Sequence, residues 1–202
     1  MSSKKQIDFI FDFASPNAYL SYHALKKLLP KEVNIHYIFC LLGGMFKLTN
    51  NQAPMIAFAH IPNKLNYMSL EIKRFIEKYK LDHFKMNTHF PVMTLLIQRI
   101  GVYLAIQNKE KEYINVMLKA MWEDNKKCDD PDVVKTILSD AGFDANACLL
   151  ASQDQAIKDQ LAKNTQNCVD KGCFGIPSFL LRDELFFGKD SLPVLLEHLE
   201  LL

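Results

Sequence analysis

The feature that most constrains the fold is a strand that passes directly into a helix near the start of the chain. Apolar residues alternate from Ile7 to Phe13, and this period of two predicts a β-strand. Ser15 and Pro16 follow, a favoured pair for a helix N-cap and a first helical residue. Residues 33–40 predict a second strand. This β-α-β order predicts an α/β sheet with a right-handed crossover.

The middle of the chain has a different pattern. Apolar residues recur there with a helical period, and β-branched runs are few, which predicts helices at residues 68–79, 91–108, 112–125, 130–140 and 145–163. After them, residues 178–181 and 184–187 flank a polar pair and predict a hairpin, followed by a closing helix. We therefore expect a discontinuous sheet domain, residues 1–58 plus 166–202, around an all-helical insertion at residues 59–165.

The overall composition excludes several classes of partner. The 202 residues carry a formal net charge of +1, which argues against nucleic acid or an anionic membrane surface. No apolar run is long enough to span a bilayer, and the charged start leads into no leader-like apolar segment, so we expect a cytoplasmic protein. The five cysteines show no Cys-x-x-Cys spacing, which favours neither a disulfide framework nor a metal site.

Two distant motifs carry a resemblance to a known family. Residues 11–20, FDFASPNAYL, and residues 172–179, GCFGIPSF, followed by 185–190, LFFGKD, resemble the 2-hydroxychromene-2-carboxylate isomerase and kappa-class glutathione transferase family. The resemblance extends over nearly the whole chain, and its two ends are its specific parts. It implies a thioredoxin-like fold of the DsbA type with a helical insertion, glutathione as cofactor, a small electrophilic substrate and a homodimer.

In this family the serine at the helix start hydrogen-bonds the sulfur of glutathione, and Ser15 stands at that position. A hydroxyl donor at a helix N-terminus favours a thiolate. The simpler interpretation is that Ser15 caps the helix. The two roles are compatible, because a hydroxyl oxygen can accept from the backbone while its proton is donated elsewhere.

Pro177 matches the family's cis-proline, so the backbone of Ile176 is expected to pair with the cysteinyl part of glutathione. A trans proline opening an edge strand is the alternative. The segment Gly188, Lys189 and Asp190 matches the family's contact with the γ-glutamyl end, although Asp190 or its neighbour could equally cap the last helix.

The resemblance implies two further contacts around the site and one departure from the family. Asn51 aligns with an asparagine that contacts glutathione, although the flanking residues depart from the family pattern. Lys64 aligns with a lysine near the substrate or a glutathione carboxylate, and a solvated lysine is the alternative. Met93 replaces a polar residue of the family, which predicts a more apolar substrate pocket. Trp122 is expected in the core.

Several functions remain open from the sequence. The resemblance implies a glutathione-dependent isomerase, in which the thiolate adds reversibly to a conjugated aromatic or hydroxy-carboxylate substrate. A kappa-like glutathione transferase or peroxidase, and a non-catalytic thiol-peptide-binding dimer, are the alternatives. A DsbA-type disulfide oxidoreductase needs two cysteines at the helix start, and residues 15–18 read SPNA.

Overall fold

The structure is a computed structural model that describes residues 5–200. Residues 1–4, on which the expectation about a leader partly depends, and residues 201–202 lie outside this range. The elements are β1 (Gln6–Phe11), α1 (Pro16–Leu28), β2 (Asn34–Phe39), α2 (Leu42–Leu48), α3 (Pro54–Ala57), α4 (Pro62–Tyr79), α5 (Leu95–Ile106), α6 (Glu110–Trp122), α7 (Pro131–Asp140), α8 (Ala145–Ala151), α9 (Gln155–Asp170), β3 (Ser178–Leu181), β4 (Glu184–Phe187), the 3-10 turn η1 (Lys189–Ser191) and α10 (Leu192–Glu200).

One mixed sheet unites the two ends of the chain. Its strand order is β2-β1-β3-β4, with β1 parallel to β2 and β3 antiparallel to both β1 and β4. Phe9 of β1 stands opposite Tyr37 of β2 and Phe179 of β3, so segments far apart in sequence share one register. This arrangement confirms the predicted α/β class, the opening β-α-β unit and the closing hairpin.

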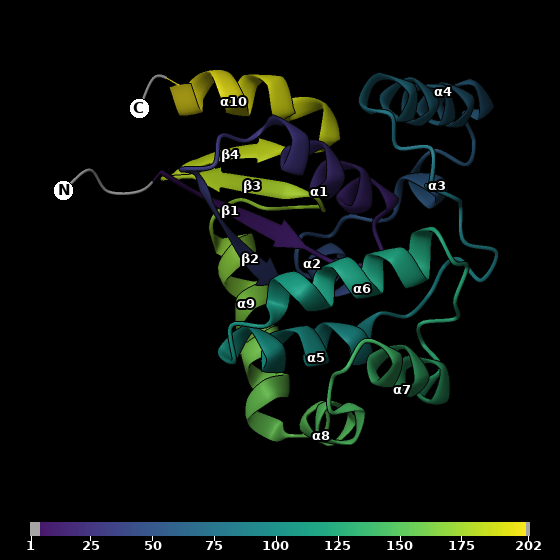
Figure 1. The fold of residues 1–202 in the computed structure, drawn as a ribbon. Helices are drawn as coiled ribbons and strands as arrows, with labels where there is room; N and C mark the ends of the chain where they lie inside the picture. Colours follow the sequence, from purple (N-terminus) through teal and green to yellow (C-terminus); the bar gives the residue numbers. More distant parts are fainter. Residues whose placement is uncertain (1–4, 201–202) are drawn as a thin grey trace.

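Helices cover both faces of the sheet. In Figure 1, α1 and α10 lie on one face and α9 on the other, while α4, α7 and α8 lie farther from the sheet. Helix α5 also contacts β2. Aromatic side chains fill the core where sheet and helices meet, and Phe11 and Phe13 pack edge to face at 4.8 Å between ring centroids. Trp122 is fully buried, and its Nε1–H donates to the main-chain oxygen of Phe13 at 3.0 Å, which confirms its expected place in the core.

Several predicted boundaries were wrong. The single helix expected at residues 145–163 is two helices, because Asp154 begins a new one by accepting a hydrogen bond from the amide of Ala156. The helix expected from Pro91 begins only at Leu95. The short helices α2 and α3 were not predicted. Two of the seven residues in α2 are glycines, which weakens a helical pattern.

The division into a discontinuous sheet domain and an insertion at residues 59–165 remains a prediction. Helix α9 begins inside the proposed insertion, continues past residue 165 and contacts β2. None of the helices within residues 5–200 combines the length and the apolar character needed to cross a bilayer.

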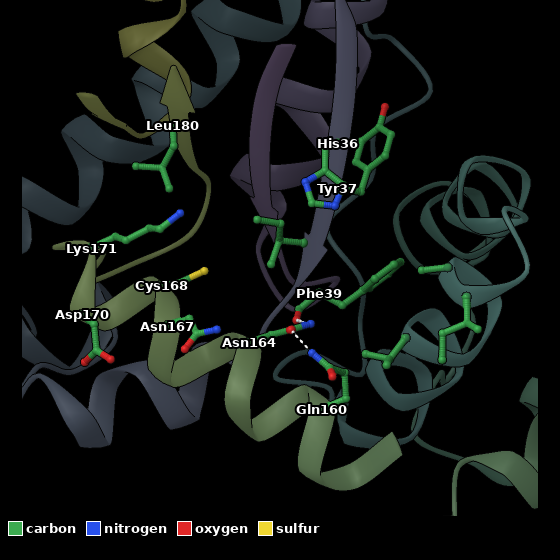
Figure 2. A pocket seen from close by; sticks show the side chains of 14 residues that line it. His36, Tyr37, Phe39, Gln160, Asn164, Asn167, Cys168, Asp170, Lys171 and Leu180 are labelled. Atoms are coloured by element: carbon green, nitrogen blue, oxygen red, sulfur yellow. Dashed lines mark hydrogen bonds between the residues drawn. The ribbon is translucent and has the colours of Figure 1, made fainter. Parts of the chain in front are cut away.

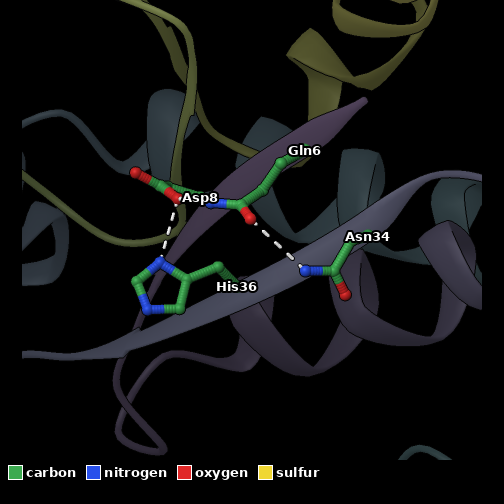
Figure 3. Close-up of polar contacts among 4 residues, drawn as sticks. All are labelled: Gln6, Asp8, Asn34 and His36. Atoms are coloured by element: carbon green, nitrogen blue, oxygen red, sulfur yellow. Dashed lines mark hydrogen bonds and ion pairs between the residues drawn. The ribbon is translucent and has the colours of Figure 1, made fainter. Parts of the chain in front are cut away.

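The sheet face on the α9 side carries a polar cluster near the start of β1. Asp8 and His36 are cross-strand neighbours, and His36 Nδ1 lies 3.0 Å from Asp8 Oδ1 (Figure 3). The hydrogen bond to His36 lowers the pKa of Asp8, and the same bond raises the pKa of His36. Gln6 and Asn34 form the adjacent pair, with 3.4 Å between Asn34 Nδ2 and Gln6 Oε1.

Candidate functional site

Ser15 lies where the chain passes from β1 into α1. It is the N-cap of α1, with Pro16 as the first helical residue, and its Oγ accepts a hydrogen bond from the amide of Ala18 at 3.2 Å. The same hydroxyl donates to the main-chain oxygen of Ile176 at 2.9 Å. Only 5% of Ser15 is exposed. Ser15 therefore caps the helix, as the simpler interpretation predicts, and its proton is also directed at the loop before β3.

The loop that faces Ser15 contains a cis peptide and is held by hydrogen bonds. The Ile176–Pro177 peptide is cis, as the family match suggested. The amide of Gly188 donates to the Pro177 oxygen at 2.9 Å, and the Ser178 hydroxyl donates to the Gly175 oxygen at 2.7 Å. Within residues 5–200 no acceptor is found for the amide N–H of Ile176, and only 6% of the residue is exposed. This N–H donor is therefore free to pair with a ligand.

Asn51 lies close to this loop. Its Nδ2 donates to the Phe174 oxygen at 3.0 Å, two residues before Ile176, and its Oδ1 accepts from the amide of Gln52 at 2.8 Å. The structure thus brings Asn51 to the same loop as Ser15. Its side chain is exposed, so it is accessible to a ligand as well.

The segment after β4 approaches the loop through its backbone. Gly188 has φ 82°, a conformation that favours glycine, and this places its amide on Pro177. Lys189 is buried, with its ammonium 2.7 Å from Asp190 Oδ1 and 5.3 Å from the centre of the Phe75 ring. The carboxylate of Asp190 is therefore paired with a neighbour. A small cavity of about 230 Å³ between α4 and α10 includes Lys189 and Asp190 in its lining.

Lys64 stands apart from these residues. It is exposed in the first turn of α4, and its ammonium lies 3.3 Å from the centre of the Phe58 ring. No hydrogen bond or ion pair within residues 5–200 joins it to Ser15, Ile176, Asn51 or the segment after β4. The structure thus places four of the predicted segments together and leaves the role of Lys64 a prediction.

The substrate side was predicted through Met93. This residue is 70% exposed, and it directly precedes Thr94, whose hydroxyl contacts the base of the Ser15 turn. Phe174 and Phe187 are also substantially exposed, and their rings lie 4.4 Å apart beside the Ile176 loop. The neighbourhood of the site is accordingly rich in exposed apolar side chains.

The sequence analysis did not predict a role for Asp12, whose side chain is hydrogen-bonded to the turn that carries Ser15. Its carboxylate accepts hydrogen bonds from the amides of Ala14 and Leu42 and from the Thr94 hydroxyl, at 2.9, 2.7 and 2.6 Å. Burial raises its pKa to about 6, although these hydrogen bonds oppose the rise. An acid within an alternating apolar strand was the available signal.

A larger cavity lies elsewhere in the fold. It has a volume of about 590 Å³ between β2, α5 and α9, and Figure 2 shows His36, Asn164 and Lys171 among its lining residues. None of the predicted site residues lines it. This cavity is therefore separate from the residues that the sequence predicts for the site.

None of the five cysteines forms a disulfide. Cysteines 40, 128, 148, 168 and 173 are all buried and unbridged. Burial raises the pKa of Cys128 to about 12, which disfavours the thiolate that exchange requires. Within residues 5–200 no His, Cys, Asp and Glu side chains gather in a way that could hold a metal ion.

A hydroxyl at a strand-to-helix junction that faces a cis-proline loop on the adjacent strand defines a site of the thioredoxin-like class. A family model described as the DSBA-like thioredoxin domain matches residues 6–200, and the chain belongs to this family. The family match confirms the predicted thioredoxin-like fold of the DsbA type.

The chain is also similar in sequence to two groups of enzymes within this fold family. The chain is 26% identical over 189 residues to the 2-hydroxychromene-2-carboxylate isomerase of Pseudomonas sp. (strain C18), covering 92% of this chain and 86% of that protein. It is 25% identical over 218 residues to glutathione S-transferase kappa 1 of Caenorhabditis elegans, covering 99% and 93%. These relatives are enzymes, in agreement with the expectation of an enzyme and with the predicted family.

Solved structures give the same picture of the fold. A 2-hydroxychromene-2-carboxylate isomerase matches with a TM-score of 0.80 at 24% identity, over 96% of this chain and 94% of the other. DsbA of Pseudomonas aeruginosa matches with a TM-score of 0.57 at 14% identity, over 99% and 84%. At these identities the likeness concerns the fold alone.

Proposed function

We propose that the protein is a glutathione-dependent enzyme whose Ser15 hydroxyl stabilises the thiolate of the bound cofactor. The observation that carries this proposal is the hydroxyl of Ser15, which is buried at the N-terminus of α1 and points its proton across the site to Ile176 at 2.9 Å. A donor in this position can turn to a sulfur anion, and the helix N-terminus adds a favourable partial charge. Bound glutathione would supply a nucleophilic thiolate.

The residues present fit a thiol peptide. The unpartnered amide of Ile176 is available to donate to the carbonyl of the cysteinyl part, as in the addition of a short strand. Asn51 and the backbone at Gly188 flank the same loop. Asp190 would hold the α-amine of the γ-glutamyl end, with the buried Lys189 fixing its carboxylate. Lys64 is proposed near a carboxylate of the ligand or substrate.

The reaction that we favour is reversible addition to a conjugated aromatic or hydroxy-carboxylate substrate. Ser15 would stabilise the sulfur anion both before addition and after elimination, so the same hydroxyl serves both directions. Cofactor is then regenerated, which makes the net reaction an isomerisation. The isomerases among the relatives support this choice.

A kappa-like glutathione transferase is the second candidate, because the C. elegans relatives carry that name. Ser15 would have the same role, and the conjugate would leave as product; a peroxidase would use the same thiolate. A non-catalytic thiol-peptide-binding dimer is the remaining alternative. We also propose a cytoplasmic homodimer with the two-part domain division described above.

Binding and turnover of the unmodified protein test the proposal. We expect retention on immobilised glutathione, elution by free glutathione, and glutathione-dependent isomerisation of a 2-hydroxychromene-2-carboxylate. Conjugation of 1-chloro-2,4-dinitrobenzene without isomerisation would favour the transferase. Binding without either reaction would leave the binding dimer, and absence of binding would contradict the proposal as a whole.

A further inference from the structure

The turn that presents Ser15 is closed twice by one residue. Asp12 directly follows β1, and its main-chain oxygen accepts the amide of Ser15 at 3.1 Å. Its side-chain Oδ1 accepts the amide of Ala14 at 2.9 Å. An aspartate that bonds its own backbone two residues on is a common way to hold a tight turn. The position of Ser15 therefore depends on where the side chain of Asp12 is held.

The carboxylate of Asp12 is in turn held by two other segments. Its Oδ2 accepts the amide of Leu42 at 2.7 Å, the first residue of α2, where no side chain of the N-cap residue forms a capping bond. Its Oδ1 also accepts the Thr94 hydroxyl at 2.6 Å, directly before α5. The turn, α2 and the start of α5 thus meet on one carboxylate, which is 1% exposed.

A carboxylate is energetically unfavourable in this buried position. Burying it without a cation is unfavourable. The charged side chains on the elements packed around it are Asp8 on β1, Lys26 and Lys27 on α1, Lys47 on α2 and Arg99 on α5, and none of them contributes to its shifted pKa. Its stabilisation comes from neutral donors alone.

The three hydrogen-bond donors explain why an asparagine side chain could not replace the carboxylate of Asp12. Three donors converge on the two oxygens, and an ionised carboxylate is the side chain that accepts at both. Asparagine has a single oxygen, so its NH₂ group would face the Leu42 amide if the oxygen kept the other two bonds. Either orientation places two donors against one another and moves the turn.

We propose that Asp12 is the positioning residue of the site, and that its ionised carboxylate sets the direction of the Ser15 hydroxyl relative to Ile176. The proposal deepens the function proposed above and rests on it for the chemical consequence. When the Asp12 carboxylate is protonated or replaced, the turn loses a hydrogen bond to α2 or to the residue before α5. The Ser15 hydroxyl then no longer points toward the thiol of bound glutathione.

The test compares three variants by two measurements. Asp12→Asn removes an acceptor, Thr94→Val removes one donor while keeping the carboxylate, and Asp8→Asn is the matched control, a carboxylate on the same strand that pairs with His36 instead. The first measurement is the distance between Ser15 Oγ and the Ile176 oxygen in crystals without ligand. The second is the pKa of the bound glutathione thiol, from the ultraviolet absorbance of the thiolate across a pH series.

We expect Asp12→Asn to lengthen the Ser15–Ile176 contact beyond hydrogen-bonding distance, to raise the thiol pKa and to lower turnover about tenfold or more, since small misplacements of a reacting group are costly. Thr94→Val should act in the same direction but less, and it carries the test if Asp12→Asn does not fold. Asp8→Asn should change neither measurement.

An unchanged contact and an unchanged thiol pKa in Asp12→Asn, or failing that in Thr94→Val, would overturn the proposal. The two proposals fail differently. If the unmodified protein does not bind glutathione while Asp12→Asn still displaces Ser15, the function is wrong and the positioning role stands. If glutathione binds and its thiol pKa depends on Ser15 but not on Asp12, the positioning role alone is wrong.

Discussion

The hydroxyl of Ser15 and the main-chain oxygen of Ile176 lie 2.9 Å apart although 161 positions of sequence separate them. The contact joins the first strand-to-helix turn of the chain to the loop that leads into β3, and antiparallel pairing of β1 with β3 makes it possible. A hydroxyl that serves only as a cap needs no such partner. The contact therefore joins the helix cap to the loop that contains the cis-proline.

Replacement of Ser15 by alanine is expected to preserve the fold and to abolish most glutathione-dependent turnover. Loss of the cap should cost about 1 kcal/mol of stability. The matched control is Ser21→Ala, because Ser21 is buried on the same helix and its Oγ has no partner within the described residues. Turnover and thermal unfolding of both variants provide the measurement, and wild-type turnover in Ser15→Ala would show that the residue is a cap only.

Stability should respond to pH through Asp12. Its pKa is raised from 3.8 to about 6, so the folded state binds more protons than the unfolded state between these values. The contribution of this group to stability therefore falls as the pH rises from about 4 to 6, by roughly 3 kcal/mol. Urea unfolding of the protein and of Asp12→Asn across this range would reveal it as the difference between the two pH curves; parallel curves would contradict it.

The pair of Asp8 and His36 should stabilise the fold most between the pKa values of its two members, and its contribution should fall at both lower and higher pH. The raised pKa of His36 gives stability that is complete below pH 6.5 and lost as the pH rises through the folded-state value. The lowered pKa of Asp8 gives stability that is present above pH 3.8 and lost below it. Asp8→Asn should therefore destabilise mainly between about pH 4 and 6.5, and by less than about 1 kcal/mol, because the His36 side chain is 57% exposed.

Nuclear magnetic resonance titration of His36 checks this directly. Its pKa should fall toward the ordinary value in Asp8→Asn, because the hydrogen bond to Asp8 is the main cause of the rise. An identical pKa of His36 in both proteins would show that the contact does not persist in solution.

Packing between α5 and β2 predicts a contrast between two glycines. A Cβ on Gly101 would collide with the ring of Phe39, whereas a Cβ on Gly43 in α2 would meet nothing within 4 Å. Gly101→Ala should destabilise by about 1–3 kcal/mol through overpacking, and Gly43→Ala should be neutral or stabilise by about 0.5 kcal/mol. Chemical unfolding of the two variants decides, and equal effects would contradict the described packing.

The sequence alone indicated most of the architecture, because apolar periodicity and turn residues are local properties. The opening strand, its Ser15–Pro16 helix start and the closing hairpin follow from such patterns, and the structure confirms them. The split of the long helix at Asp154 and the short helix α2 were missed, since a cap within a continuous apolar pattern and a glycine-containing turn of helix leave weak local signals.

Tertiary structure decided which of the marked residues meet. Ser15 and Pro177 are recognisable in the sequence as a helix start and a strand opening, but only the pairing of β1 with β3 places the hydroxyl against Ile176. Asp12 shows most clearly what the sequence alone could not predict. Its position after a strand is visible in the sequence, whereas its three donors come from the turn, from α2 and from the residue before α5, and those segments converge only when the core closes around them.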